Sequence, residues 1–150
     1  MKTKIIFAVI ALCTIFTAST SFAQEQEIVG KKELLMKTQW KLPINDDSKH
    51  MSFQMSFDNG YQITTVVMGD QHYVDKYEYY LSNHADSVFV KSNVGKSNDG
   101  NYLIVNKIWG NNNEVIASRI LKLTPDELVL KNTSKKVVIG SKISRLVADH

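Results

Sequence analysis

The chain has 150 residues, with 18 basic and 15 acidic side chains and a formal net charge of +3. Lys2 and Lys4 lie in a leading segment described below, and without them the remainder is close to neutral. That balance argues against nucleic acid as a partner, because phosphate backbones are bound by strongly basic faces. The single cysteine, Cys13, lies in the same segment. Disulfides, thiolate catalysis and cysteine–zinc sites are therefore excluded from the rest of the chain.

The first 23 residues predict a secretory signal peptide. A basic start is followed by an apolar run over residues 5–16, and Ser21 and Ala23 place small residues where a signal peptidase cleaves. The run is shorter than the stretch of about 20 apolar residues that spans a bilayer, although an uncleaved anchor helix is the alternative. We therefore expect export to the periplasm or the extracellular space, and one domain over residues 24–150 without a membrane span.

After this segment, the chain begins with a predicted helix and then changes to a strand pattern. Residues 25–36 form the only plausible helix. From Met51 to Phe57 apolar and polar side chains alternate, which predicts a strand with one buried and one wet face. Asn59 and Gly60 follow, a pair that favours a tight turn because both residues tolerate positive φ. The next strand is predicted over residues 61–68, so the two strands form a hairpin.

The rest of the chain repeats short strands and turns. Further strands are predicted at residues 72–82, 87–91, 102–109, 115–123, 127–131 and 137–146. Together with a first strand at Trp40, they predict an all-β, antiparallel, up-and-down barrel of about eight or nine strands with a short N-terminal helix. A β-sandwich is the alternative, because it produces the same strand pattern.

Several short segments resemble the small secreted lipocalin-like proteins of Bacteroidetes-type bacteria. Residues 34–42 read LLMKTQWKL, a short helix leading into a strand with a tryptophan. Residues 79–82 (YYLS), 94–96 (VGK), 100–102 (GNY) and 123–130 (LTPDELVL) are similar to later parts of the same family. The resemblance covers residues 34–146. It implies an antiparallel barrel of the calycin type, closed by a helix and able to hold a small apolar ligand.

The same resemblance implies a structural plug at the closed end of the barrel. Trp40 matches the tryptophan of the family, and Arg145 is the candidate for the late arginine that packs on it. A guanidinium over an indole contributes about 0.5–2 kcal/mol. Thr38 stands where true lipocalins carry a glycine, so the chain departs from their strict pattern.

Residues that carry catalysis or bind metals show no suitable arrangement. The histidines are His50, His72, His84 and His150. They lack the close spacing of zinc ligands, and no serine lies in a Gly-x-Ser-x-Gly elbow. The paired carboxylates at residues 46–47 and 126–127 fall in predicted turns, where we expect them to be exposed to solvent and unsuited to general acid catalysis. We therefore expect no enzymatic activity, no metal and no cofactor.

The aromatic side chains lie on successive predicted strands. In a barrel of about eight strands they either fill the interior or line a cavity for one ligand. We expect a cavity that binds a small apolar or amphipathic molecule, for example a lipid. The lining residues expected from strand alternation are Phe53, Met55, Phe57, Ile63, Tyr77 and Tyr79. An error of one residue in the register of a strand would place all of its expected lining residues on the outer face.

The alternative function belongs to a different class. A packed barrel would bind a protein through its outer face or through the loops at residues 43–50 and 93–101. Such a protein would act as an inhibitor, an immunity-type protein or an envelope accessory protein. A filled interior with an apolar patch outside would favour this alternative.

Overall fold

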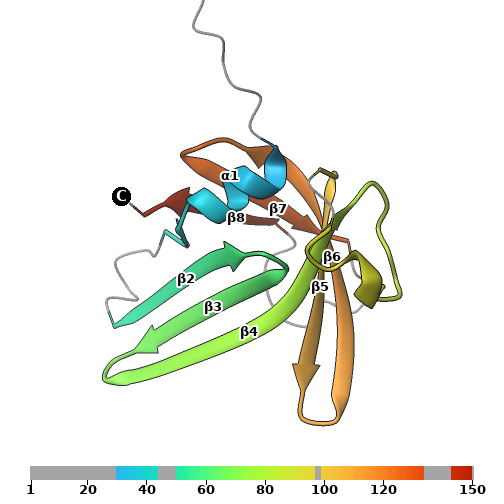
Figure 1. Cartoon of the computed structure of the whole chain (residues 1–150). Helices are drawn as coiled ribbons and strands as arrows, with labels where there is room; N and C mark the ends of the chain where they lie inside the picture. The colour runs from blue at the N-terminus through green and yellow to red at the C-terminus, as the bar shows by residue number, and fades with distance from the viewer. Residues whose placement is uncertain (1–29, 44–49, 97–98, 134–142, 150) are drawn as a thin grey trace, which may run out of the picture.

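The computed structural model describes residues 30–43, 50–96, 99–133 and 143–149. They form one closed barrel of eight antiparallel strands in sequence order, with a short helix over one end (Figure 1). β1 pairs with both β2 and β8, which closes the sheet on itself. The predicted up-and-down barrel is thus confirmed, and the sandwich alternative is wrong. The predicted signal peptide at residues 1–23 lies outside the described residues.

The strands have between two and twelve residues. The helix is α1 (Lys31–Lys37), and a 3₁₀ turn, η2, covers Lys91–Asn93. The strands are β1 (Trp40–Lys41), β2 (Met51–Asp58), β3 (Tyr61–Met68), β4 (Gln71–Ser82), β5 (Tyr102–Trp109), β6 (Asn112–Leu123), β7 (Glu127–Asn132) and β8 (Ile143–Ala148).

The hairpin of β2 and β3 confirms the prediction from its alternating pattern. The two strands pair from Met51↔Met68 to Asp58↔Tyr61 and leave two residues for the turn. Gly60 takes a φ of 86°, whereas no residue other than glycine has a positive φ in the described chain. The turn therefore depends on its glycine alone, because a side chain at this φ is strained.

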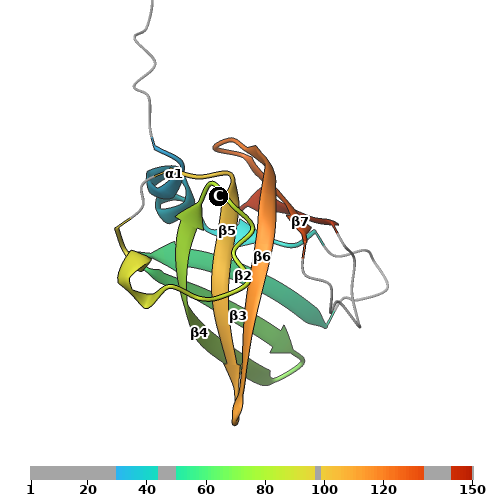
Figure 2. The same ribbon diagram turned by 90° about the vertical axis from the view of Figure 1, so that its right-hand side faces the viewer.

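The strand predicted at residues 87–91 is wrong. β4 pairs directly with β5, for example through Tyr80↔Ile104, so no edge remains between them for another strand. The connection from β4 to β5 instead crosses the outer face of the barrel (Figure 2). There Phe89 packs on Tyr80, with ring centroids 5.2 Å apart. Of the apolar side chains that suggested a strand, Phe89 covers this outer cluster of Tyr80, Ile104 and Ala117, whereas Val88 and Val90 are exposed.

Several predicted boundaries shift. The helix predicted over residues 25–36 is described only from Lys31 to Lys37, and residues 25–29 lie outside the described part. β6 starts at Asn112, earlier than predicted, because the turn after β5 needs only two residues. The last strand runs over Ile143–Ala148, whereas residues 137–142 of its predicted range lie outside the described residues.

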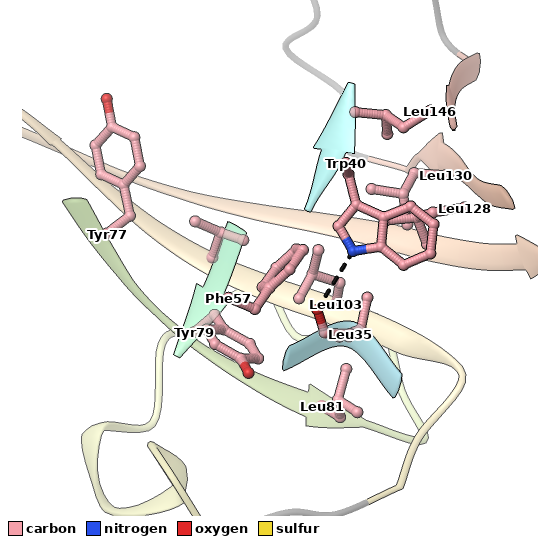
Figure 3. Packing of buried hydrophobic residues seen from close by; sticks show 11 residues of the cluster. Leu35, Trp40, Phe57, Tyr77, Tyr79, Leu81, Leu103, Leu128, Leu130 and Leu146 are labelled. Atoms are coloured by element: carbon pink, nitrogen blue, oxygen red, sulfur yellow. Dashed lines mark hydrogen bonds between the residues drawn. The ribbon is translucent and has the colours of Figure 1, made fainter. Parts of the chain in front are cut away.

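The core lies at the end of the barrel that α1 covers, called here the packed end (Figure 3). Leu35 of α1 and Trp40 of β1 are completely buried. The indole Nε1 of Trp40 donates a hydrogen bond to the carbonyl oxygen of Leu35, at 3.3 Å. The side chains packed with them come from β2, β4, β5, β7 and β8: Phe57, Tyr77, Tyr79, Leu81, Leu103, Val105, Leu128, Leu130 and Leu146.

A buried lysine ties α1 to the barrel. The Nζ of Lys32 donates hydrogen bonds to Asn59 Oδ1, at 2.7 Å, and to the carbonyl oxygen of Gly95, at 2.6 Å. Both acceptors lie in connections between strands. One side chain therefore links the helix to the β2–β3 turn and to the loop before β5.

We expect Lys32→Met to lower the free energy of unfolding by roughly 1–3 kcal/mol, because it removes two charge-assisted hydrogen bonds and leaves their acceptors without this donor. Lys37→Met is the matched control. Lys37 forms an exposed i,i+4 ion pair with Glu33, which is worth only about 0.3–0.5 kcal/mol. Urea denaturation followed by circular dichroism measures both variants. Equal losses for the two lysines would contradict the anchoring role of Lys32.

Candidate ligand-binding cavity

The barrel contains a partly open cavity of about 290 Å³. It lies directly beside the packed end, because Leu103, Val105, Leu130 and Leu146 belong to both, and β2, β3, β5, β6, β7 and β8 contribute to its wall. The lining residues are Leu42, Phe53, Met55, Gln62, Leu103, Val105, Lys107, Ile116, Ser118, Leu130, Asn132, Ser144 and Leu146. The interior is thus filled at one end and hollow beyond it.

The wall combines apolar side chains with a few polar groups, which is typical of small-molecule sites. Eight of the lining residues are aliphatic, aromatic or methionine, and the polar ones are Gln62, Lys107, Ser118, Asn132 and Ser144. Gln62 is buried, and its Nε2 donates to Thr64 Oγ1 at 3.1 Å. Lys107 carries the one formal charge among these lining residues. The arrangement can therefore hold an apolar body and orient a polar group.

The residues predicted to line a cavity divide into three groups. Phe53 and Met55 line it. Phe57 and Tyr79 face the interior but belong to the packed end, where their rings meet edge to face with centroids 5.2 Å apart. Tyr77 is also buried in this cluster. Alternation along β2 and β4 therefore identified the inward face, while the packing around α1 decides which inward residues are filled core.

Ile63 was expected to face inward and does not. Phe57 pairs with Gln62, and Met55 pairs with Thr64, so the even-numbered residues of β3 share the inner face. Ile63 lies opposite Ser56 on the outer face. The prediction placed the more apolar set of alternate residues on the inner face, but in β3 the buried residues Gln62 and Thr64 lie inside. Register with β2, rather than apolarity, decides the orientation of this strand.

The hydroxyl of Tyr79 is buried at the packed end, and its oxygen has no hydrogen-bond partner among the described residues. Burial, with a smaller effect of the negative charge on Asp58, raises the pKa of Tyr79 to about 12. The phenol therefore stays protonated at neutral pH. It does not line the cavity, and it contributes to the core rather than to a ligand site.

The predicted packing of Arg145 on Trp40 is wrong. Arg145 pairs with Val129 on β7, and its side chain is 70% exposed. Its Nε lies 3.0 Å from Glu127 Oε1 in an ion pair on the outer face. The next residue, Leu146, is the one that faces the core. Trp40 is covered by α1 and leucines instead.

β4 and β5 separate beyond the packed end. Their pairing runs from Ser82↔Tyr102 to Glu78↔Asn106, but β4 begins at Gln71 and β5 continues to Trp109. Figure 1 shows the β3–β4 and β5–β6 hairpins diverging below this point. Lys107 is the first residue of β5 past the last pair, and its Nζ lies 5.4 Å from the ring centroid of Tyr77.

The prediction omitted most of the cavity wall. Leu103, Val105 and Lys107 alternate along β5 and face inward together. Their period-two spacing was a usable signal, but the prediction considered aromatic residues first and so left this strand out. The contributions of β6, β7 and β8 depend on barrel closure.

Among the described residues, no three histidine, cysteine, aspartate or glutamate side chains gather where they could hold a metal ion. Within those same ranges, no helix combines the length and the apolar character needed to cross a membrane.

Comparisons with family models, with curated proteins and with solved structures found no match for this chain. The eight-stranded antiparallel barrel is compatible with a lipocalin-like protein but is not specific to that family.

Proposed function

We propose that this protein is a non-catalytic carrier that binds a small apolar or amphipathic molecule inside its barrel. The observation that carries this proposal is the internal cavity of about 290 Å³. Its wall combines eight apolar with five polar residues, and sites for small molecules likewise join apolar surface to a small number of polar groups. The volume lies just below their usual range of about 300–1,000 Å³, so we expect a small ligand.

We also propose that the carrier works outside the cytoplasm. The basic start, the apolar run over residues 5–16 and the small residues Ser21 and Ala23 support cleavage after residue 23. A domain that acts there without disulfides depends on its core for stability. The packed end supplies such a core, with Leu35 and Trp40 completely buried.

Native mass spectrometry of the protein purified after expression of the full chain tests this proposal. We expect an added mass on the folded protein that disappears on denaturation, and a denatured polypeptide that begins at Gln24. A bare folded mass, together with no binding of fatty-acid and retinoid-like probes, would contradict the carrier function. Retention of the first 23 residues would contradict export by signal cleavage.

We expect Val105→Phe to weaken binding of any such probe at least roughly ten-fold, because the larger ring occupies space that the ligand needs. Val105 is buried and lines the cavity. Val74→Phe is the matched control, since Val74 is 65% exposed on the separated part of β4. Titration calorimetry measures the affinity, and circular dichroism shows that each variant is folded. Full affinity in folded Val105→Phe would exclude this cavity as the binding site.

A further inference from the structure

We propose that two copies of this protein form a symmetric dimer, in which the free edge of β4 in one copy pairs with the same edge of the other. The surface is the part of β4 that lies beyond its pairing with β5, residues 71–76. None of these residues lines the cavity, so the inference is independent of the proposed carrier function.

The backbone of this part of β4 offers hydrogen-bond donors and acceptors that no strand uses. The N–H of Tyr79 donates to the carbonyl oxygen of Gly60, at 2.9 Å, so the odd-numbered residues of β4 direct their backbone groups toward β3. Successive residues of an antiparallel strand alternate in this respect, and the even-numbered residues therefore face the β5 side. On that side the pairing with β5 stops at Glu78. Among the described residues, no strand there pairs with the backbone groups of His72, Val74 and Lys76.

The free edge is accessible along its whole length. Figure 1 shows β4 as the outermost strand of the layer formed by β2, β3 and β4, with the β5–β6 hairpin turned away from it. Residues 71–76 are all exposed, and the apolar surface among them includes Tyr73 and Val74, which are 47% and 65% exposed. An incoming strand can therefore reach the backbone of β4 from this side.

The devices that usually protect an exposed edge are missing from this one. Such edges commonly carry a proline, a bulge or a lysine that keeps other strands away. Residues 71–76 contain no proline, and their pairing with β3 runs without a shift in register. The one lysine, Lys76, has its Nζ at 4.1 Å from the ring centroid of Tyr61. Its charge thus lies over β3 rather than at the free edge.

The edge is complementary to itself, and this property selects a second copy as the partner. A two-fold axis perpendicular to the sheet makes two copies of β4 antiparallel and places each even-numbered residue opposite another even-numbered one. With the axis at Val74, this residue opposes Val74 of the second copy, and His72 opposes Lys76 of the second copy. All the free backbone groups then meet in hydrogen-bonded pairs, which gives about six hydrogen bonds between the copies. The contact closes on itself, as in most soluble homodimers.

The side chains favour this register over its neighbours. With the axis at Val74, the two exposed valines meet on the outer face, and Tyr73 of each copy lies opposite Asp75 of the other on the inner face, where a phenol can donate to a carboxylate. An axis at Asp75 would bring two like charges directly opposite each other, which is unfavourable. An axis at Tyr73 would place Lys76 opposite Asp70, which lies in the turn before β4 and not in the strand.

The edge of β5 at the same opening is a poorer partner for β4. β5 ends at Trp109, and its last pair with β4 is at Asn106. Because backbone groups alternate along the strand, only Ile108 directs its N–H and carbonyl toward the opening beyond that pair. A contact between β4 of one copy and β5 of the next would therefore form fewer hydrogen bonds, and it would leave a free edge at each end of the assembly. Pairing of β4 with itself uses the longer edge in both copies.

Sedimentation velocity of the protein, purified after expression of the full chain, measures the association. It is run at about pH 8, so that the imidazole opposite each lysine is neutral. We expect a reversible equilibrium between monomer and dimer. Val74→Pro removes the central N–H from the free edge without removing a hydrogen bond to β3, a position at which strands tolerate proline. We expect it to raise the dissociation constant of the dimer at least roughly ten-fold.

Val74→Thr is the matched control for Val74→Pro. Threonine keeps the N–H and a β-branched side chain, so the dissociation constant should stay within about two-fold of the wild-type value. Circular dichroism shows whether each variant is folded.

Introduced cysteines test the register. In a Cys13→Ser background, Val74→Cys should form a disulfide-linked dimer under mild oxidation, because the Cα atoms of a hydrogen-bonded pair lie about 5.5 Å apart, within the range of a disulfide. In His72→Cys the two thiols lie four residues apart along the paired strands, roughly 14 Å, and should not link at a comparable rate. Val88→Cys is the control for random collision, since Val88 is 72% exposed and lies outside the edge. Electrophoresis without reductant measures the three rates.

Three results would overturn the proposal. The first is a wild-type protein that remains monomeric up to roughly 1 mM. The second is a dimer whose dissociation constant folded Val74→Pro leaves unchanged, because the interface would then lie elsewhere. The third is linking of Val74→Cys no faster than that of His72→Cys or Val88→Cys. If Val74→Pro does not fold, the cysteine variants decide the question, since they keep the backbone of β4 intact.

Discussion

Replacing Trp40 with alanine is expected to lower the free energy of unfolding by about 3–5 kcal/mol. The indole is completely buried and is packed among Leu35, Leu128 and Leu146. β1 has only two residues, so little else holds this strand between β2 and β8. Truncation leaves a cavity at the packed end and removes the hydrogen bond to the carbonyl oxygen of Leu35. Urea denaturation followed by far-ultraviolet circular dichroism gives the free energy without using tryptophan fluorescence.

Arg145→Ala is the informative control for this prediction. If an arginine plugged the barrel over the tryptophan, the two substitutions would destabilise the protein together. The exposed side chain of Arg145 and its ion pair with Glu127 predict instead a change within about 1 kcal/mol. A Trp40→Ala loss below about 1 kcal/mol would contradict the central position of Trp40, since burial of this size normally contributes more.

Gly100→Ala is expected to lower the free energy of unfolding by about 3 kcal/mol, at the upper end of the range for overpacking. A Cβ on this buried glycine would lie 2.6 Å from the backbone nitrogen of Ser82 and 2.7 Å from its carbonyl oxygen. These atoms belong to the end of β4, so they cannot move aside as a flexible side chain can. The substitution forces apart the end of β4 and the chain that enters β5.

Gly69→Ala provides the comparison for Gly100→Ala. At Gly69 an added Cβ meets no atom within 4 Å, although the φ of 59° is unfavourable for alanine. The expected cost is about 1 kcal/mol from the backbone conformation alone. The same urea denaturation measures both variants. A Gly100→Ala loss no larger than that of Gly69→Ala would show that the close approach to Ser82 does not constrain the fold.

The two predicted losses concern Trp40 and Gly100, neither of which lines the cavity. Substitution of either residue should change stability with a small effect on affinity, whereas Val105→Phe should change affinity in a protein that stays folded. This separation allows stability and ligand binding to be tested independently in the same protein.

Local sequence signals were sufficient to predict several of the strands. The alternation from Met51 to Phe57 and the glycine at residue 60 were sufficient for β2 and β3. A long strand ending at Ser82 and a strand over Tyr102–Trp109 were also predicted correctly. These features depend on neighbouring residues, because the side-chain period and the turn conformation are local properties of the backbone.

Orientation and closure were decided only by the tertiary structure. Alternation shows that a strand has two faces, but the partner strand decides which face is inside, as it does for Gln62 and Ile63. The same reason places Arg145 outside. Direct pairing of β4 with β5 excludes a strand at residues 87–91.

The sequence by itself therefore determined an antiparallel all-β domain with its main hairpins, and an inward face on β2 and β4. Only the tertiary structure decided that α1 fills one end while a cavity remains beyond it, with Lys107 at the point where β4 and β5 part. The physical reason is that the barrel closes by pairing β1 with β8, two strands that are far apart in the sequence. The space left inside depends on all the strands at once, and no local pattern records it.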